Sequence, residues 1–124
     1  MIEQEYRLHE FEAAMAHLKT TLHLTDEVMM RLNNKFFDSV ALTLGQLQEA
    51  IDTADHDLVE RLAHSIKGGS SSLQYTLISE IATRLEEKAQ AKEDNSYQVS
   101  LNALIEEFTT AQACYVLWKA KKGE

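Results

Sequence analysis

Hydrophobic residues recur at intervals of three and four positions over most of the chain, which is the period of an amphipathic α-helix. Five segments show this pattern, and the first, roughly Tyr6 to Leu18, is short and mixed in character. The second follows Thr25, the third begins near Asp55, the fourth follows Thr76 and the fifth follows Asn95. No segment alternates with a period of two, so the pattern predicts an all-α protein.

The four longer segments each carry one apolar stripe that we expect to face a shared core. The first two stripes are Met29, Leu32, Phe36, Val40, Leu44, Leu47 and Ile51, and then Leu58, Leu62, Ile66, Gly69 and Leu73. The next two are Ile78, Ile81, Leu85 and Ala89, and then Leu101, Leu104, Ile105, Phe108, Tyr115 and Trp118.

The connections between these four segments are short: "DTAD", "QYT" and "EDN". Short connections between long amphipathic helices favour antiparallel neighbours, so we expect an up-down-up-down four-helix bundle. Thr25 is the expected N-cap of the first bundle helix, and the additional short N-terminal helix would cover one end or edge. The 124 residues suffice for one domain, residues 1–124, with a bundle core at about 25–121.

Composition narrows the function classes. The absence of proline and the presence of only four glycines argue against folds with many tight turns. A net charge of −8 without a basic patch argues against a nucleic-acid partner. No apolar run reaches the roughly 18 residues of a membrane span, and the N-terminus lacks the pattern of a signal peptide. Cys114 is the only cysteine, which excludes an internal disulfide and fits a reducing cytoplasm.

The stretch "HSIKGGSSS", from His64 to Ser72, has three interpretations: a hinge, a phosphate-binding loop, or a continuous helix. A hinge would strand Leu73, which continues the apolar stripe beyond the serines. A phosphate-binding loop needs its lysine after the last glycine, whereas Lys67 precedes both glycines. The stretch is therefore predicted to be helical.

His64 is expected on the solvent side of this helix. Leu62 and Ile66 each lie two residues away, about 200° around the helix axis, so His64 faces water if they face the core. Lys67, Gly68 and Ser71 lie three, four and seven positions on and share the face of His64. The result is an exposed imidazole with a cation beside it and bare backbone around it. Such an imidazole can be approached by a bulky partner and can carry an anion.

These residues are similar to those of a known family. "LAHSIKGGSSSL", followed by "RLEEKA", resembles the histidine-containing phosphotransfer (HPt) family, and "HSIKGG" is close to the phosphotransfer domain of chemotaxis-type histidine kinases. The matching positions are Ala63, His64, Lys67, Gly68, Gly69, Leu85 and Glu86. The motif covers about 25 residues, and the bundle pattern extends the resemblance from about Thr25 to Trp118.

The resemblance implies a role for each matching side chain. His64 would be the phosphoacceptor, Lys67 would interact with the phosphoryl oxygens, and Gly68 would give a partner access. Glu86 would accept a hydrogen bond from Nδ1–H of His64 and leave Nε2 as the nucleophile, a role that suits a carboxylate because it fixes the tautomer. By residue type alone, a second interpretation stays open, in which Glu86 is a solvated charge paired with Arg84 or Lys88.

The resemblance also implies partners. These would be response-regulator receiver domains, a hybrid sensor histidine kinase, or both, and Glu60, Arg61, Gly68 and Ser71 would line the contact surface. Magnesium would be needed only in the receiver domain, so this chain would hold no metal and no cofactor. It carries no ATP-binding glycine-rich motif. We therefore expect a monomeric bacterial phosphocarrier without kinase activity of its own. Met1 and the "KAKKGE" ending favour a complete small protein over a fragment of a kinase.

One position departs from the family, which often has a glycine shortly after the phosphohistidine helix. This chain has Leu73, Gln74 and Tyr75 there. Either Gln74 adopts a turn conformation that glycine adopts easily, or the helix runs longer.

Two other functions compete with phosphotransfer. His56, Glu60 and His64 have the i, i+4, i+8 spacing of helical metal ligands, although the outer two lie ~12 Å apart by helical rise. The second alternative is a helical interaction module that is never phosphorylated. His9, His17 and His23 have no convergent partners and are interpreted as surface residues.

Overall fold

The computed structural model of the chain describes residues 2–123, without the side chains of residues 2–4 and 94. These residues contain five α-helices and no β-strand, which confirms the all-α prediction. The helices are α1 (Ile2–Leu22), α2 (Asp26–Asp52), α3 (His56–Ser72), α4 (Thr76–Gln90) and α5 (Tyr97–Lys122), with a short 3-10 helix η1 (Asp94–Ser96) before α5. The N-terminal helix has 21 residues, so the expectation of a short helix was wrong.

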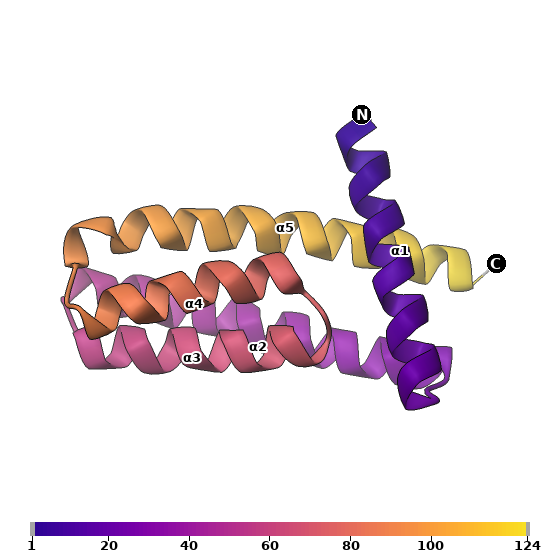
Figure 1. Cartoon of the computed structure of the whole chain (residues 1–124), viewed down its shortest axis with the longest axis horizontal. Helices are drawn as coiled ribbons and strands as arrows, with labels where there is room; N and C mark the ends of the chain where they lie inside the picture. The colour runs from indigo at the N-terminus through magenta and orange to yellow at the C-terminus, as the bar shows by residue number, and fades with distance from the viewer. Residues whose placement is uncertain (1, 124) are drawn as a thin grey trace.

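The helices α2 to α5 lie lengthwise beside one another, and α1 crosses them near one end (Figure 1). The most extensive packing joins α3 to α4, while α2 packs on α3 and α5, and α5 also packs on α4. Both termini lie at the end where α1 crosses (Figure 1). None of the helices among residues 2–123 is long and apolar enough to traverse a lipid bilayer.

Helix ends follow local sequence. The hydroxyl of Thr25 accepts a hydrogen bond from the amide of Val28, and the carboxylate of Asp55 accepts one from the amide of Leu58. These side chains satisfy amide groups that the first turn of a helix leaves without partners. Thr25 is therefore the N-cap of α2, as predicted, and Asp55 caps α3 where the sequence predicted that this helix starts. Helix α4 starts at Thr76 itself, one residue earlier than expected.

Every connection between α-helices contains a non-glycine residue in the left-handed region. The φ angles are 56° at His23, 52° at Ala54, 63° at Gln74 and 58° at Lys92. After α3, the amide of Tyr75 donates to the carbonyl of Ser70 at 2.8 Å and the amide of Gln74 donates to Ser71 at 3.1 Å. This pair of bonds is a Schellman motif, which usually has glycine at the position of Gln74. Of the two outcomes expected at Gln74, the structure shows the turn.

The buried stripes agree with the sequence on α2, α4 and α5, with four exceptions. Leu32 on α2 and Ile105 on α5 are exposed, and Ile51 and Ile81 are only partly buried. Most of the predicted stripe residues are in the core: Met29, Phe36, Val40, Leu44, Leu47, Ile78, Leu85, Ala89, Leu101, Leu104, Phe108, Tyr115 and Trp118.

On α3 the prediction was confirmed at Ile66, but the rest of the predicted stripe was wrong by about one position. The buried residues are Val59, Ala63, Ile66 and Ser70, whereas Leu58, Leu62 and Leu73 are partly buried and Gly69 is exposed. Small side chains at the centre of the stripe permit close approach of α4, and the longer leucines pack along the flanks.

A buried aromatic and polar cluster holds the turn between α3 and α4. The ring of Tyr75 stacks on Phe36, with centroids 4.6 Å apart. Its hydroxyl donates to Oδ1 of Asn33, and the amide of Asn33 donates to the carbonyl of Met29 at 2.8 Å. Burial raises the pKa of Tyr75, so the phenol stays protonated and remains a donor. The turn therefore has a fixed place against α2, which fixes the start of α4.

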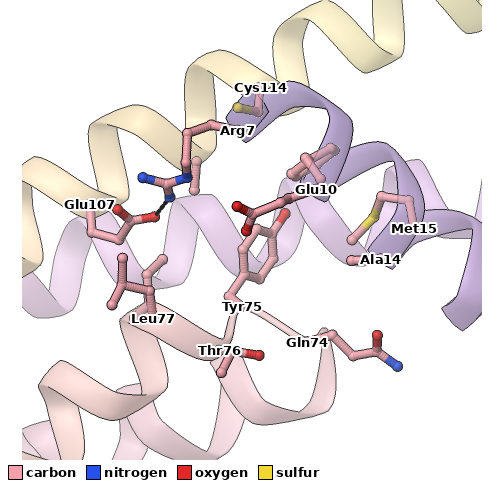
Figure 2. A pocket seen from close by; sticks show the side chains of 13 residues that line it. Arg7, Glu10, Ala14, Met15, Gln74, Tyr75, Thr76, Leu77, Glu107 and Cys114 are labelled. Carbon is pink, nitrogen blue, oxygen red and sulfur yellow. Dashed lines mark hydrogen bonds and ion pairs between the residues drawn. The ribbon is translucent and has the colours of Figure 1, made fainter. Parts of the chain in front are cut away.

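Helix α1 is held by apolar and ionic contacts. Phe11, Met15 and Leu18 are buried in the common core. Arg7 forms an ion pair with the buried Glu107 of α5, at the edge of a cavity of about 330 Å³ between α1, the α3–α4 turn and α5 (Figure 2). The helix α1 therefore covers the end of the fold at the α3–α4 turn, whereas His64 is in the middle of α3.

Candidate functional site

His64 projects from the middle of α3 into solvent. Its side chain is 68% exposed. The neighbouring Ala63 and the following Ile66 are buried, while Leu62, expected in the core, is half-buried. The expected exposure of His64 is therefore observed, although the buried face is centred on Ala63 instead of Leu62.

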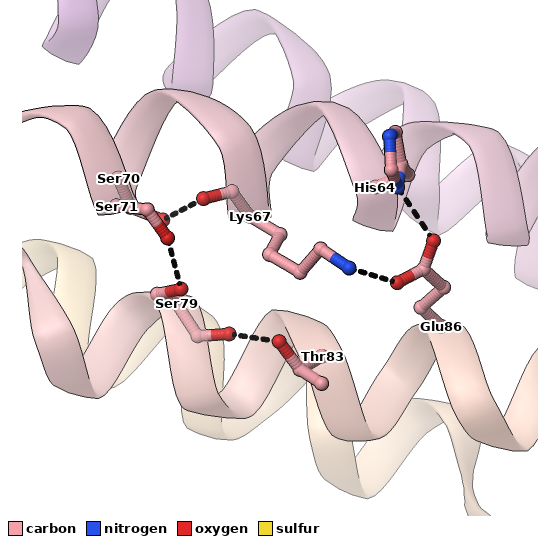
Figure 3. A network of polar contacts seen from close by, with 7 residues as sticks. All are labelled: His64, Lys67, Ser70, Ser71, Ser79, Thr83 and Glu86. Carbon is pink, nitrogen blue, oxygen red and sulfur yellow. Dashed lines mark hydrogen bonds and ion pairs between the residues drawn. The ribbon is translucent and has the colours of Figure 1, made fainter.

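Glu86 reaches His64 from the adjacent helix α4. Its Oε2 lies 2.7 Å from Nδ1 of the imidazole, and its side chain is only 11% exposed. An ionised carboxylate only accepts hydrogen bonds, so Nδ1 carries the proton and donates it. Nε2 keeps its lone pair and points away from Glu86 (Figure 3). The alternative of a solvated charge paired with Arg84 or Lys88 is wrong, because Glu86 is buried and Lys88 donates to Ser100.

Lys67 binds the other oxygen of the same carboxylate. Its Nζ lies 2.9 Å from Oε1 of Glu86, so His64 and Lys67 share one anion (Figure 3). The hydrogen bond from Lys67 lowers the pKa of Glu86, burial opposes this shift, and the bond to His64 adds to it. Glu86 therefore stays ionised at neutral pH and keeps both partners in place.

The two glycines after Lys67 differ in their surroundings. A Cβ added to Gly68 would meet no atom within 4 Å, so this position opens directly to solvent beside the imidazole. A Cβ added to Gly69 would lie 3.7 Å from Cδ1 of Phe36, which is an ordinary contact. Gly68 thus keeps the space next to His64 clear.

A row of hydroxyl groups continues the site along the α3–α4 groove, beyond Lys67 (Figure 3). Oγ of Ser71 lies 2.7 Å from Oγ of Ser79, and Thr83 donates to the carbonyl of Ser79 at 2.8 Å. Ser79 and Thr83 were missed in the sequence. Their spacing of i, i+4 and i+7 with Glu86 places all three on one face of α4 and is the signal that identifies them.

The residues that we expected to contact a partner differ in their exposure to solvent. Arg61, Gly68 and Ser71 are exposed, and Glu60 is half-buried.

The metal site expected as an alternative would need His56 as a ligand, but His56 has another partner. Its Nδ1 lies 2.9 Å from the hydroxyl of the buried Tyr97. Over the described residues, no three His, Cys, Asp or Glu side chains converge as metal ligands. The alternative of a site formed by His56, Glu60 and His64 is therefore not favoured.

Comparison with known proteins identifies the family. Residues 31–113, more than half of the chain, match the family model of the Hpt domain. The chain belongs to the Hpt domain family. This Hpt protein also matches the crystal structure of histidine-containing phosphotransfer protein B (HptB) from Pseudomonas aeruginosa PAO1, with a TM-score of 0.76 and 23% sequence identity. The match covers 90% of this chain and 91% of that one, so the two share a fold. No curated protein sequence matches the chain.

Membership of the family confirms the function predicted from the sequence, which is histidine phosphotransfer in a phosphorelay. The two alternatives, a metal-binding protein and an unphosphorylated interaction module, are not favoured.

Proposed function

We propose that Nε2 of His64 accepts a phosphoryl group from a receiver-domain aspartate and donates it to another. The 2.7 Å contact between Nδ1 of His64 and Oε2 of Glu86 carries this proposal. It fixes the proton on the inner nitrogen and leaves the outer nitrogen as an exposed nucleophile.

The transfer itself balances as an exchange of bonds at phosphorus. The lone pair of Nε2 forms the P–N bond, the P–O bond of the aspartyl phosphate breaks, and the aspartate leaves as a carboxylate. The imidazole ring, still protonated on Nδ1, becomes positively charged, and the buried carboxylate of Glu86 stabilises that charge. The reverse exchange returns the phosphoryl group to a receiver.

Lys67 is placed to assist the phosphoryl oxygens. Its ammonium group has three N–H donors, of which the bond to Glu86 uses one. The flexible stem of the lysine permits a second donor to reach a phosphoryl oxygen while the bond to Glu86 persists. Gly68 admits the partner because no side chain covers the backbone there.

The partners that fit this chemistry are response-regulator receiver domains, a hybrid sensor histidine kinase, or both. The receiver supplies the aspartate and the magnesium ion, so this chain holds no cofactor and acts as a carrier without kinase activity. Arg61, Gly68 and Ser71 would contact the receiver, with Glu60 at the edge of the contact.

We further propose the finer features expected from the sequence. Residues 1–124 act as one domain, and α2 to α5 form an antiparallel up-down-up-down bundle with its core at about 25–121. The protein acts as a monomer in the cytoplasm, without a nucleic-acid or membrane partner.

The test is phosphorylation by radiolabelled phospho-receivers purified from the same cell, with His64→Gln and His17→Gln compared with the unchanged protein. We expect label on the unchanged protein and on His17→Gln, where the exposed histidine of α1 is the matched control. Label on His64→Gln would contradict the assignment of the phosphoacceptor.

A further inference from the structure

The cavity between α1, the α3–α4 turn and α5 has a volume of about 330 Å³ (Figure 2). Part of its lining is apolar and comes from Phe11, Met15 and Ile78, which are buried. Small-molecule sites in proteins are commonly cavities of roughly 300–1,000 Å³ that combine apolar side chains with a few polar groups. The cavity therefore has the size and the lining of a site for a small organic ligand.

Three charged side chains line the rest of the cavity: Arg7, Glu10 and Glu107. Arg7 and Glu107 form an ion pair with each other. The side chain of Glu10 extends from α1 into the cavity (Figure 2), and its carboxylate forms no hydrogen bond or ion pair with another described residue. One guanidinium and two carboxylates leave one negative charge in the cavity, and that charge belongs to Glu10.

The other ionisable groups of the lining add no charge. Burial raises the pKa of the Cys114 thiol and of the Tyr75 phenol, so both are neutral at neutral pH. The phenol also donates its proton to Asn33 of α2. The carboxylate of Glu10 is therefore the polar group in the cavity that is free to bind a ligand.

The cavity is separate from the phosphotransfer site. Its lining contains none of His64, Lys67 and Glu86. One wall of the cavity is α1, whereas the match to the family model begins at residue 31. A ligand site here would thus be a function of this chain in addition to phosphotransfer.

We propose that this cavity binds a small organic ammonium ion, whose charged group pairs with Glu10 and whose apolar body packs on Phe11 and Met15. A hydrogen bond between an ammonium and a carboxylate is about twice as strong as one between neutral groups, and removal of the apolar body from water adds to the affinity. A ligand with a carboxylate would have to displace Glu107 from Arg7 and would lie beside Glu10, where like charges repel. The net charge of −8 of the chain also attracts cations.

The test is a titration of the whole protein with 2-phenylethylammonium, followed by ¹H–¹⁵N NMR of the backbone amides. We expect saturable binding with a Kd of about 1 mM or tighter, and shifts concentrated at Tyr75, Leu77 and Ala111 in the cavity lining. 3-Phenylpropanoate, which has a carboxylate in place of the ammonium, should bind about tenfold more weakly or less. Ethylammonium, which lacks the ring, should not saturate the protein at the same concentrations.

Glu10→Gln removes the charge and should raise the Kd for 2-phenylethylammonium about tenfold. Glu5→Gln is the matched control, because Glu5 is also exposed on α1 but lies outside the cavity, and it should leave the Kd unchanged. Ala14→Leu places a larger side chain in the cavity and should abolish binding. If Ala14→Leu does not fold, the comparison of Glu10→Gln with Glu5→Gln decides.

Equal Kd values for the ammonium and the carboxylate would overturn the inference. So would an equal effect of Glu5→Gln and Glu10→Gln, which would show a general attraction of cations to the acidic surface, or unchanged binding to a folded Ala14→Leu. No step of the test uses phosphorylated His64, so its outcome is independent of the proposed function.

Discussion

Lys67 and His64 contact opposite oxygens of one carboxylate, that of Glu86, at 2.9 and 2.7 Å. The two side chains come from one helix and the carboxylate comes from the next, so the α3–α4 packing sets the geometry of the site. The orientation of the His64 and Lys67 side chains is therefore set before any partner binds. Less conformational entropy of these side chains is then lost during transfer.

Replacing Glu86 by alanine should change the tautomer of His64 and slow transfer. Without the acceptor at Nδ1, the proton is no longer held there, and a fraction of the rings places it on Nε2, where it blocks the nucleophile. We expect transfer to fall about 10- to 100-fold but not to vanish, because the imidazole remains. Imidazole ¹⁵N shifts report the tautomer. Glu87→Ala, an exposed neighbour on α4, is the control, and an equal loss of rate there would show a general charge effect.

The lowered pKa of Glu86 also predicts a pH dependence of stability. Because the folded protein lowers this pKa, ionised Glu86 stabilises the folded state above its ordinary pKa of about 4.3. That contribution is lost as the pH falls through the lowered pKa. The free energy of unfolding should therefore exceed that of Glu86→Gln most at about pH 7, and the difference should shrink towards about pH 3. Chemical denaturation at several pH values measures it, and a constant difference would contradict the prediction.

Gly68 should trade stability for access. Gly68→Gln adds a better helix former at an open position and should stabilise the protein by about 0.5–1 kcal/mol. The new side chain occupies the space beside His64, so transfer from phospho-receivers should slow. Gly45 on α2 is the matched control, because a Cβ there also meets no atom within 4 Å. Gly45→Gln should give the same gain in denaturant midpoint with an unchanged rate, and a slowed rate in both variants would argue against the access role.

Gln74 should be improved by glycine. Its φ of 63° places a side chain in the left-handed region, which costs an L-residue roughly 1–2 kcal/mol. Gln74→Gly should raise the free energy of unfolding by about 0.5–1 kcal/mol, after the greater flexibility of glycine in the unfolded chain is counted. Ala91→Gly, at a φ of −85°, should instead destabilise. Thermal or chemical unfolding distinguishes the two, and a loss of stability in Gln74→Gly would contradict this account.

Arg7 should matter for the attachment of α1. Arg7→Met leaves the buried carboxylate of Glu107 without its cation and should lower the free energy of unfolding by about 1–2 kcal/mol. Lys121→Met, which breaks the exposed pair with Glu12, should cost less than about 0.5 kcal/mol. Denaturant titrations compare the two, and equal effects would mean that the Arg7–Glu107 pair adds nothing beyond a surface contact.

The sequence predicted most of the helices because their signals are local. Thr25 and Asp55 cap helices through contacts three residues away, and the stripes of α2 and α5 are long enough to define one face. On α3 the large leucines at 58 and 62 suggested the wrong centre, because only the packing of α4 shows that Ala63 and Ser70 lie innermost. Helix α1 was underestimated since its polar first turns are held by Glu107, 100 positions away.

The site followed the same division. His64, Lys67 and Gly68 were apparent because they lie within one turn of a single helix. The role of Glu86 needed the resemblance to the family, and only the packing of α4 on α3 separates a buried acceptor from a surface charge. The spacing of Ser79 and Thr83 with Glu86 places them on one face of α4, but only the packing of α4 on α3 shows that this face lies beside Ser71.

The exposure of His64 has a consequence for timing. A nitrogen that a receiver can reach is also reachable by water, so a phosphoryl group on Nε2 would be exposed to solvent. The lifetime of the phosphoryl group would then be set by the intrinsic lability of the P–N bond. Hydrolysis would compete with the diffusion of the next receiver to His64. Such a carrier transfers its phosphoryl group only if the next receiver binds before water hydrolyses the P–N bond. The concentration of receivers in the cell, more than any motion of this chain, would therefore set how long a signal lasts.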